Sequence, residues 1–285
     1  MSQSNGVALV ELGSGHGFAV KDVALGHTDQ GDPAREIALY RTAASMPEVA
    51  SVVPRFFLHD ESENLLITEG LLSARRIDAQ RSRSALDPLS ARSFGTALGT
   101  WHRASRGMTG LAASRPWLLS LDGDDRLEVI DRSDVLRALA DRVLADDGHR
   151  AVIDDLRTAW TPDTTIHGDV RFSNVLVRAD GTSALIDWEY AGQGDVHWDV
   201  AGAVQEFMSA GANFAGVGFT APITAFLSAY AVARGTEPDR RRLAVFVSGR
   251  LLVRAFQIAA WTSDPGDEID RHLALARAAS RLAAA

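Results

Sequence analysis

The sequence predicts an α+β protein in which a small β-rich lobe precedes a larger, mainly helical lobe. Three observations lead to this prediction. Short apolar segments bounded by turn residues dominate the first 71 residues, segments with helical spacing follow from about residue 86, and one short β segment near residue 165 interrupts the helices. We therefore expect two lobes, residues 1–71 and 72–285, in a chain long enough to bury a substantial core.

The small lobe is expected to contain four strands and one helix. The predicted strands are Val7–Leu12, Phe18–Leu25, Val52–His59 and Asn64–Leu71. A helix is predicted over Ala34–Ser45, because its apolar residues recur on one side and Pro33 suits a first helical turn. The segment Gly13–Gly17 joins the first two strands, and its glycines fit either a phosphate-binding loop or a plain hairpin turn.

The large lobe is expected to consist of helices around one hairpin region. The predicted helices are Ser90–Ser105, Ser133–Ala145, Gly148–Trp160, Val196–Ala210, Pro222–Arg234, Pro238–Thr262 and Asp267–Ala284. The predicted strands are Thr165–Gly168, Asn174–Arg178 and Ala184–Trp188, with a turn at Ala179–Gly181. Polar side chains at the ends of short apolar strands can face a cleft, so we expect the chemistry of the protein in this region.

Composition excludes several classes of function. The net charge of −8 and the pI of about 5.5 argue against a general nucleic-acid binder, which needs a basic face. The absence of cysteine excludes disulfides, thiolate metal sites and thiol catalysis. No apolar run approaches the roughly 20 residues that span a bilayer, and residues 1–6 show no secretory signal. A cytoplasmic protein that contacts neither nucleic acid nor membrane is the simplest interpretation.

Cation usage singles out one residue. All of the 29 basic residues except Lys21 are arginine. A chain-wide preference for arginine, as a GC-rich genome would give, makes an exception either a chance survivor on the surface or a position that needs an ammonium group. The role of Lys21 depends on what surrounds it.

The hairpin region carries a set of hard oxygen donors. Asp169 and Asn174 lie in the stretch Thr165–Val177, and Asp187 follows the next predicted strand. Carboxylate and amide oxygens without a soft ligand suit Mg²⁺, which retains waters for substrate phosphates. Phosphoryl transfer needs this metal, a base for the incoming hydroxyl, and accurate placement. A metal-dependent hydrolase could use the same carboxylates.

These residues resemble the signature of the aminoglycoside phosphotransferase and choline kinase family. The array consists of His167-Gly-Asp169, Asn174 five residues after the aspartate, and Ile186-Asp-Trp-Glu189. The resemblance implies a protein-kinase-like two-lobe fold and ATP with Mg²⁺ as cofactors. It also implies that Asp169 is the catalytic base or orients the acceptor hydroxyl, and that Asn174 and Asp187 hold the metal. His167 would brace the loop.

The same resemblance gives the lone lysine a role. A strand lysine in kinase-like folds grips the α- and β-phosphates and is held by a helix glutamate, here Lys21 and Glu36. Arg171 has two interpretations, contact with the γ-phosphate or an ion pair with Glu189 or another acid.

The segment that follows the last strand of the small lobe fits the hinge of such a fold. Thr68-Glu69-Gly70-Leu71 would read the adenine edge through backbone groups, with Glu69 and Leu71 as the contacts. Only twenty residues precede Lys21, which is enough for one strand and a turn. We therefore favour a truncated lobe whose exposed edge is completed by a protein partner or by self-association.

The acceptor stays open on the sequence alone. A hydroxyl of an aminoglycoside or amino-alcohol would suit acidic residues such as Glu206. The alternative is a kinase for Ser or Thr hydroxyls of a peptide in natural-product biosynthesis, acting with a partner protein. A nucleotide-binding pseudokinase or scaffold is disfavoured, because the catalytic set is complete.

Overall fold

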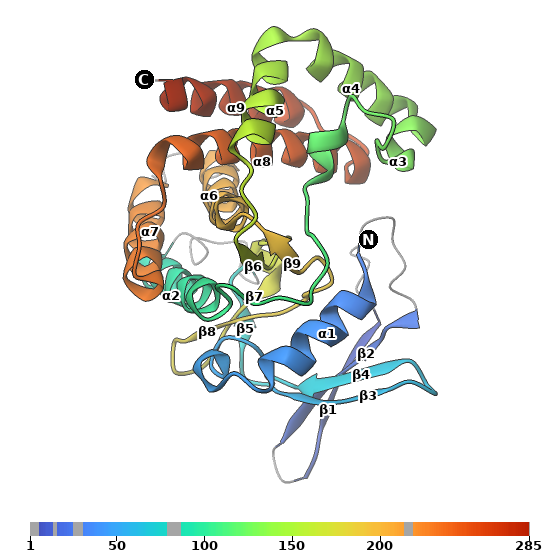
Figure 1. The fold of residues 1–285 in the computed structure, drawn as a ribbon, viewed down its shortest axis with the longest axis vertical. Coiled ribbons are helices and arrows are strands. Elements are labelled where there is room, and N and C mark those ends of the chain that lie inside the picture. Colours follow the sequence, from blue (N-terminus) through green and yellow to red (C-terminus); the bar gives the residue numbers. More distant parts are fainter. Residues whose placement is uncertain (1–5, 14–15, 25–30, 79–86, 214–218, 285) are drawn as a thin grey trace.

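The small lobe is a four-stranded antiparallel sheet with one helix across it (Figure 1). The computed structural model describes residues 6–13, 16–24, 31–78, 87–213 and 219–284. The sheet has the order β1-β2-β4-β3 and is formed by β1 (Val7–Glu11), β2 (Gly17–Asp22), β3 (Phe56–Asp60) and β4 (Leu65–Glu69). Together with the helices that follow, this sheet confirms the predicted α+β two-lobe fold.

The helix of this lobe, α1 (Pro33–Ala43), starts where the sequence supplies a cap. The Asp32 side chain accepts a hydrogen bond from the Ala34 N–H at 2.9 Å, and Pro33 stands at the first helical position, where its missing N–H costs nothing. The buried face of α1 carries Ile37, Leu39 and Tyr40. Its N-terminal turn is therefore fixed against the strand that carries Lys21.

One predicted strand begins too early. The segment from Val52 was expected to be extended, but β3 starts only at Phe56. Pro54 lacks an N–H for a sheet ladder, and Val52 and Val53 instead lie in a turn with both side chains buried. The Val52 carbonyl accepts a hydrogen bond from the Leu185 N–H at 2.8 Å, so this turn joins the small lobe to the hairpin of the large lobe.

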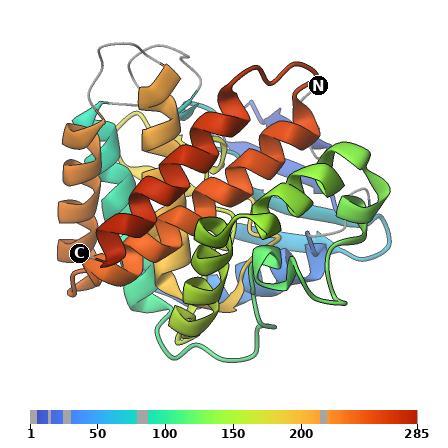
Figure 2. The same cartoon turned by 90° about the horizontal axis from the view of Figure 1, so that it is seen from above.

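The large lobe consists mainly of helices. They are α2 (Pro88–Ala104), α3 (Glu128–Arg132), α4 (Asp134–Ala145), α5 (Asp147–Ala159), α6 (Val196–Asn213), α7 (Thr220–Arg234), α8 (Arg240–Trp261) and α9 (Glu268–Ala284). Single 3-10 turns lie at Pro47–Val49, Trp117–Ser120 and Phe172–Asn174. Figure 2 shows α8 and α9 side by side across the lobe, with α2 and α7 paired along one flank.

Short strands form two small sheets between the helices. One sheet has the order β5-β7-β8 and the other pairs β6 with β9. Their bounds are β5 (Arg75–Arg76), β6 (Thr164–Ile166), β7 (Val175–Val177), β8 (Ser183–Leu185) and β9 (Gly192–Gly194). The predicted strands of this region are present but shorter, while β5, β9 and α3 were not predicted. Two- and three-residue strands leave too little alternation for a pattern to reveal.

Helix α8 is the one helix among the described residues that is long and apolar enough to cross a membrane. Most of this apolar window, 61%, is buried inside the molecule. It packs against α9, α6 and α5. The high hydropathy of α8 is therefore explained by its place in the core of the large lobe.

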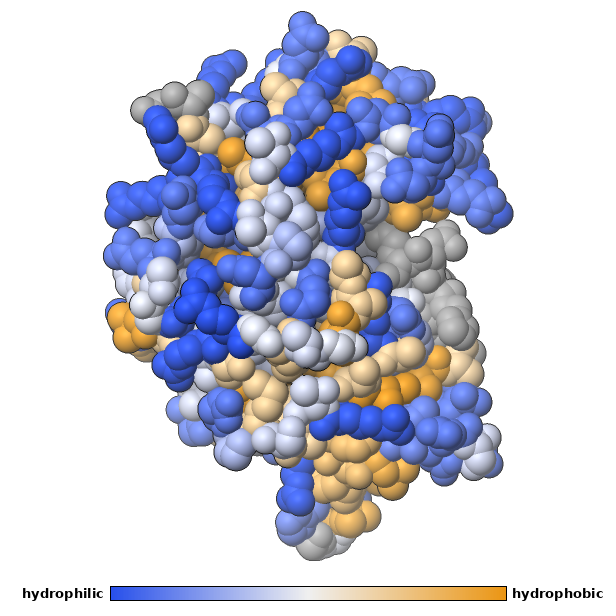
Figure 3. Space-filling model, viewed as in Figure 1, coloured by the Kyte–Doolittle hydropathy of each residue, from blue (hydrophilic) through white to orange (hydrophobic). Residues whose placement is uncertain are grey.

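The first strand of the small lobe lies at an exposed edge of the sheet. Every residue of β1 is exposed, including Leu9 at 62% and Val10 at 43%. Figure 3 shows hydrophobic residues gathered over the small lobe. The segment Gly13–Gly17 connects β1 to β2, and Glu11 pairs with Gly17. This pairing supports the hairpin-turn interpretation, although Ser14 and Gly15 lie outside the described residues.

Candidate active site

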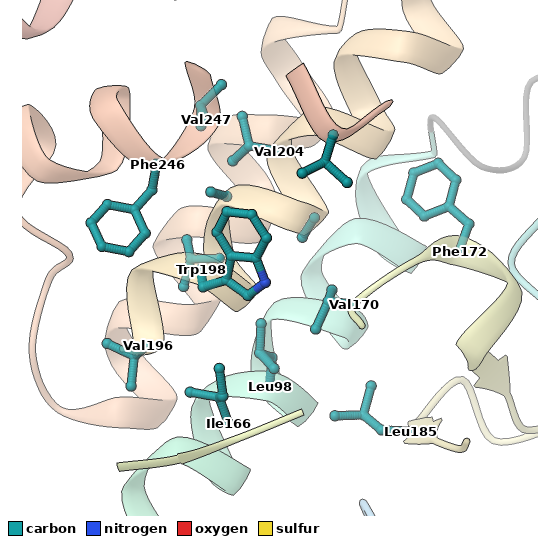
Figure 4. Packing of buried hydrophobic residues seen from close by; sticks show 14 of the residues in the cluster. Leu98, Ile166, Val170, Phe172, Leu185, Val196, Trp198, Val204, Phe246 and Val247 are labelled. Carbon is teal, nitrogen blue, oxygen red and sulfur yellow. The ribbon is translucent and has the colours of Figure 1, made fainter. Parts of the chain in front are cut away.

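The segment that carries the candidate base is anchored by two buried apolar residues. Val170 and Phe172 are buried, and Figure 4 shows both among the residues of the hydrophobic core. Asp169, which precedes Val170, is also largely buried, whereas the side chain of Arg171 is 26% exposed. A core of fixed shape thus determines the position of the polar side chains.

His167 braces the loop through both ring nitrogens. Its Nδ1 accepts a hydrogen bond from the Asp169 N–H at 3.3 Å, so its Nε2 carries the proton and donates to the Ile186 carbonyl at 2.9 Å. The ring is fully buried and lies 4.4 Å from the Trp188 ring. His167 thus ties the loop that carries Asp169 to the segment that carries Asp187.

The buried carboxylate of Asp199 stabilises the same loop by accepting two of its backbone hydrogen bonds. Asp199 on α6 accepts the backbone N–H groups of His167 at 2.6 Å and Gly168 at 2.9 Å. Gly168 has a φ of +83°, a conformation that glycine adopts without strain. On its other side Asp199 contacts His102 Nε2 at 3.0 Å, and His102 Nδ1 contacts the Tyr230 hydroxyl at 2.8 Å. A polar chain from α7 through α2 therefore supports the loop.

Lys21 lies at the meeting point of the two lobes. Its Nζ donates to Glu36 Oε2 at 2.7 Å, to Asp187 Oδ1 at 2.8 Å and, more distantly, to Glu189 Oε2 at 3.5 Å. The lysine is buried, with 7% of its surface exposed. Burial alone would lower the pKa of Lys21, but the charges of Glu36 and Asp187 outweigh it and raise the pKa above its usual range.

Glu36 joins the helix of the small lobe to the same loop. While Oε2 binds the lysine, Oε1 accepts the Trp188 N–H at 3.2 Å. The Asp32 N–H at the start of α1 also donates to the Glu189 carbonyl at 3.0 Å. The ion pair Lys21–Glu36 is therefore part of a larger set of contacts that closes α1 onto the hairpin.

Asp187 is held in an unusual backbone conformation. Its φ is +66°, in the left-handed region, which costs a non-glycine residue roughly 1 kcal/mol or more. The turn directs its carboxylate toward Glu36 and Glu189, and one oxygen from each of the three lies within 4.8 Å of the others. A third of the Asp187 side chain remains exposed to the cleft. Backbone strain of this kind is common at functional sites, where a side chain such as that of Asp187 has to be held in one position.

The chemistry of this donor set fits a hard divalent cation. Three carboxylates converge around a single ammonium group, so negative charge is in excess. Burial, together with the charge of Asp187, raises the pKa of Glu189 to about 7, which shows how poorly the cluster accommodates a further negative charge. A cation would relieve that excess, and all of the donors are oxygens, as Mg²⁺ requires.

Asn174 lies beside Asp187 because the hairpin pairs their segments. The Ile186 N–H donates to the Asn174 carbonyl at 3.0 Å, which places the two side chains at the same end of β7 and β8. The Asn174 amide also donates to the Asp169 carbonyl at 3.0 Å and more weakly to its carboxylate at 3.3 Å. The amide therefore connects the metal-binding candidates with the candidate base.

Arg171 pairs with the candidate base itself. Its Nε lies 2.8 and 2.9 Å from the two Asp169 oxygens, and one terminal nitrogen lies 2.6 Å from Oδ2. Burial alone would raise the pKa of Asp169, but the guanidinium outweighs it and lowers the pKa. Of the two interpretations of Arg171, the ion pair is present, and its partner is Asp169 rather than Glu189. Contact with a phosphate stays a prediction.

The predicted hinge follows β4 directly. The Arg55 N–H donates to a Glu69 carboxylate oxygen at 3.2 Å, and the Glu69 N–H donates to the Arg55 carbonyl at 2.8 Å. The Gly70 N–H donates to the Gly17 carbonyl at 2.9 Å. Within the described residues the Leu71 N–H has no hydrogen-bond partner, so it is available to a ligand. Adenine recognition by Glu69 and Leu71 stays a prediction.

Sequence reasoning missed two residues of α8 that lie close to Asp169. Arg250 is 4% exposed, donates to the Val170 carbonyl at 3.0 Å and stacks over Trp198 at 4.8 Å. A charged residue inside the apolar run of this helix was the available signal. Trp261 ends α8 at the surface, is 64% exposed and lies against Arg171, with its ring centre 5.4 Å from the guanidinium.

Comparisons with known proteins agree with this geometry. A family model described as the phosphotransferase enzyme family matches residues 2–246. A choline kinase of Streptococcus pneumoniae is similar in structure, with a TM-score of 0.66 and 17% identity over 100% of this chain and 92% of that one. An aminoglycoside phosphotransferase from Alicyclobacillus acidocaldarius has a TM-score of 0.58 and 16% identity, with coverages of 100% and 90%.

A third similar structure contains a nucleotide analogue. It is an amicoumacin kinase in complex with AMP-PNP, Ca²⁺ and its ligand, with a TM-score of 0.59 and 12% identity over 98% of this chain and 85% of that one. No curated protein matches the sequence. Identities this low show the fold alone, but the family model covers most of the chain, and the predicted resemblance is confirmed. The chain belongs to the phosphotransferase enzyme family.

Proposed function

We propose that this protein transfers the γ-phosphoryl group of ATP to a hydroxyl group of a small molecule, with Mg²⁺ as the metal. One observation carries the proposal. A single buried ammonium, Lys21, is held at once by the helix of the small lobe through Glu36 and by the hairpin of the large lobe through Asp187. This arrangement supports the proposal, because phosphoryl transfer needs a cation for the phosphates next to a carboxylate that can hold the metal.

The residues of the site divide the work of that reaction. Asp169 would accept the proton of the acceptor hydroxyl while the hydroxyl oxygen bonds to the γ-phosphorus and ADP leaves. Its lowered pKa keeps the carboxylate ionised at neutral pH, so it is ready to accept a hydrogen bond from the acceptor. Lys21 would exchange its contact with Asp187 for phosphate oxygens when nucleotide binds.

The metal site we propose uses Asn174 and Asp187, with Glu189 and Glu36 close behind. Mg²⁺ bound there would neutralise phosphate charge and align the phosphates. The amicoumacin kinase complex, which holds AMP-PNP and Ca²⁺, is consistent with an adenine nucleotide and a divalent cation in this fold. The absence of cysteine is compatible with the cytoplasm, where we propose that the enzyme works.

Replacement of Asp169 tests this assignment. The Asp169→Asn variant should lose transfer by roughly a hundredfold or more and keep its affinity for Mg·ATP, because the amide preserves shape but cannot accept the proton. Thermal shift with Mg·ATP measures binding, and mass spectrometry of an acceptor panel detects the gain of one phosphoryl group. The panel should include Ser- and Thr-containing peptides. A wild-type protein that binds nucleotide without ever cleaving it would instead be a pseudokinase.

We further propose that β1 pairs with β1 of a second copy of this chain. The strand is exposed on both faces and contains neither proline nor lysine, the residues that usually protect an edge. Antiparallel pairing about Leu9 places Glu11 opposite Val7, so like charges do not meet. Light scattering should show a dimer that Leu9→Lys dissociates and that Leu89→Lys, at an exposed position of α2, leaves intact. A wild-type monomer with full turnover would contradict this.

A further inference from the structure

The exposed ring of Trp261 contacts Arg171, and Arg171 in turn pairs with the candidate base, Asp169. The guanidinium of Arg171 grips Asp169 on one side and lies 5.4 Å from the centre of the Trp261 ring on the other. Trp261 ends α8 and exposes 64% of its surface. The guanidinium covers part of the indole ring. The exposed part of the ring is available for stacking by a flat group of an acceptor whose hydroxyl approaches Asp169.

The two carboxylates near Arg171, those of Asp169 and Glu206, already accept hydrogen bonds within the chain. Both Asp169 oxygens accept hydrogen bonds from Arg171. Glu206 accepts the Phe172 N–H at 3.0 Å through one oxygen and the Gln205 side-chain amide at 3.3 Å through the other. Each carboxylate thus already has donors of this chain at both oxygens and does not depend on an ammonium group of an acceptor, while the remaining lone pairs of Asp169 can still accept a hydroxyl group.

The fixed positive charges nearby are guanidinium groups. Arg171 and the buried Arg250 both act electrostatically on Asp169. The loop after Trp261 adds Asp264 and Asp267, but both are exposed, where water and salt screen their charge. The carboxylates of Asp169 and Glu206 balance the two guanidinium groups, so this side has no excess of negative charge that would attract a polycation.

We propose that the acceptor is a hydroxyl compound that stacks a planar apolar or aromatic group on Trp261 and carries at most one positive charge. The inference rests on the proposed function, since it assigns a substrate class to the same site. It replaces the expectation of an aminoglycoside, which is a polycation, and keeps that of a hydroxyl acceptor. Stacking of a flat group on an aromatic side chain is strong enough to set a preference among acceptors of roughly tenfold.

A matched pair of acceptors tests the stacking. Wild type should phosphorylate 3-phenylpropane-1,2-diol with a kcat/KM roughly tenfold or more above that for propane-1,2-diol, because the two differ only in the ring. Trp261→Ala should abolish this preference, and Trp261→Phe should retain most of it. Val232→Ala, at an exposed position of α7, is the control and should leave the ratio unchanged.

Charge is tested with kanamycin as the polycationic probe. We expect kanamycin to be the poorest acceptor of the three. If kanamycin is instead preferred over the phenyl diol, or if the phenyl preference survives in Trp261→Ala, the inference is wrong. A loss in Trp261→Ala that is equal for all acceptors, including water, would show that the tryptophan only supports Arg171, and the inference would again be wrong.

Cleavage of Mg·ATP with water as acceptor separates this inference from the proposed function. If wild type cleaves ATP and the cleavage needs Asp187, but neither diol gains a phosphoryl group, the inference fails and the proposed function stands. If wild type neither cleaves ATP nor phosphorylates any acceptor, the proposed function fails as well.

Discussion

The two sides of the proposed site balance their charges differently. On the proposed nucleotide side one ammonium, Lys21, faces the carboxylates of Glu36, Asp187 and Glu189. On the proposed acceptor side two guanidinium groups face two carboxylates, those of Asp169 and Glu206. Burial raises the pKa of Glu36 and Glu189 by more than Lys21 offsets, whereas the guanidinium of Arg171 lowers the pKa of Asp169 in spite of its burial.

The difference shows what each side is prepared to receive. Carboxylates in excess leave the nucleotide side short of positive charge, which a divalent cation supplies. On the acceptor side the positive and negative charges already balance before any ligand binds. Its ligand must therefore be recognised by shape and by a hydroxyl group, and an acceptor does not need to bring compensating charge.

The largest expected loss of activity follows from replacement of Lys21, which tests the nucleotide side. The Lys21→Arg variant should lose kcat/KM for Mg·ATP by roughly a hundredfold or more, because one compact nitrogen serves three carboxylates at 2.7–3.5 Å and a planar guanidinium cannot converge on them in the same way. Lys21→Met should lose as much and should also destabilise the metal-free protein, since the removal of one partner leaves buried charges unpaired.

Steady-state kinetics and thermal unfolding in EDTA measure both outcomes for Lys21. Arg41→Met is a matched control, because Arg41 lies on α1 with 52% of its side chain exposed. Retained activity in Lys21→Arg would mean that the only lysine of the chain is there by chance.

The nucleotide side was largely predictable from sequence, and the acceptor side was not. Lys21 was identified because it is the only lysine, and Asn174 and Asp187 because the motif fixes their spacing along one hairpin. These signals are local or compositional. The pairing of Lys21 with Glu36 needed only one strand and the next helix, which the pattern of the small lobe supplied.

The acceptor side depends on contacts between distant parts of the chain. Arg250 and Trp261 lie on α8, about 80 and 90 residues beyond the loop residues that they contact, and no motif connects the two segments. Arg171 had several acids within reach along the chain, and sequence could not choose among them. In the folded chain both Asp169 oxygens accept hydrogen bonds from Arg171, next to the buried Val170 and Phe172.

An intermediate effect is expected at Arg171. In Arg171→Ala the pKa of Asp169 should rise, because the guanidinium that lowers it is gone and burial remains. The acid limb of the pH profile of kcat/KM should then move to higher pH by about one unit or more. Arg171→Lys should move it less, since an ammonium keeps the charge but not the two-pronged contact. An unmoved acid limb with intact activity would show that Arg171 does not set the ionisation of Asp169.

The smallest effect is expected at Glu189 and concerns stability without metal. The pKa of Glu189 is about 7 in the folded protein, against an ordinary value of 4.5, so the folded state binds more protons between these values. Stability of the metal-free wild type should therefore fall as pH rises through that window. Glu189→Gln carries no titrating group there and should be the more stable protein at pH 8, by on the order of 1–3 kcal/mol, and nearly equal to wild type at pH 4.5.

Urea unfolding in EDTA at both pH values measures this difference for Glu189→Gln. Addition of Mg²⁺ at pH 8 provides the second comparison, because a cation next to Glu189 offsets both the burial of its charge and the repulsion by Asp187, which together raise its pKa. Wild type should gain more stability from Mg²⁺ than the glutamine variant does. Equal gains would place the cation away from Glu189, and the surplus of carboxylates on the nucleotide side would then have no bound cation to balance it.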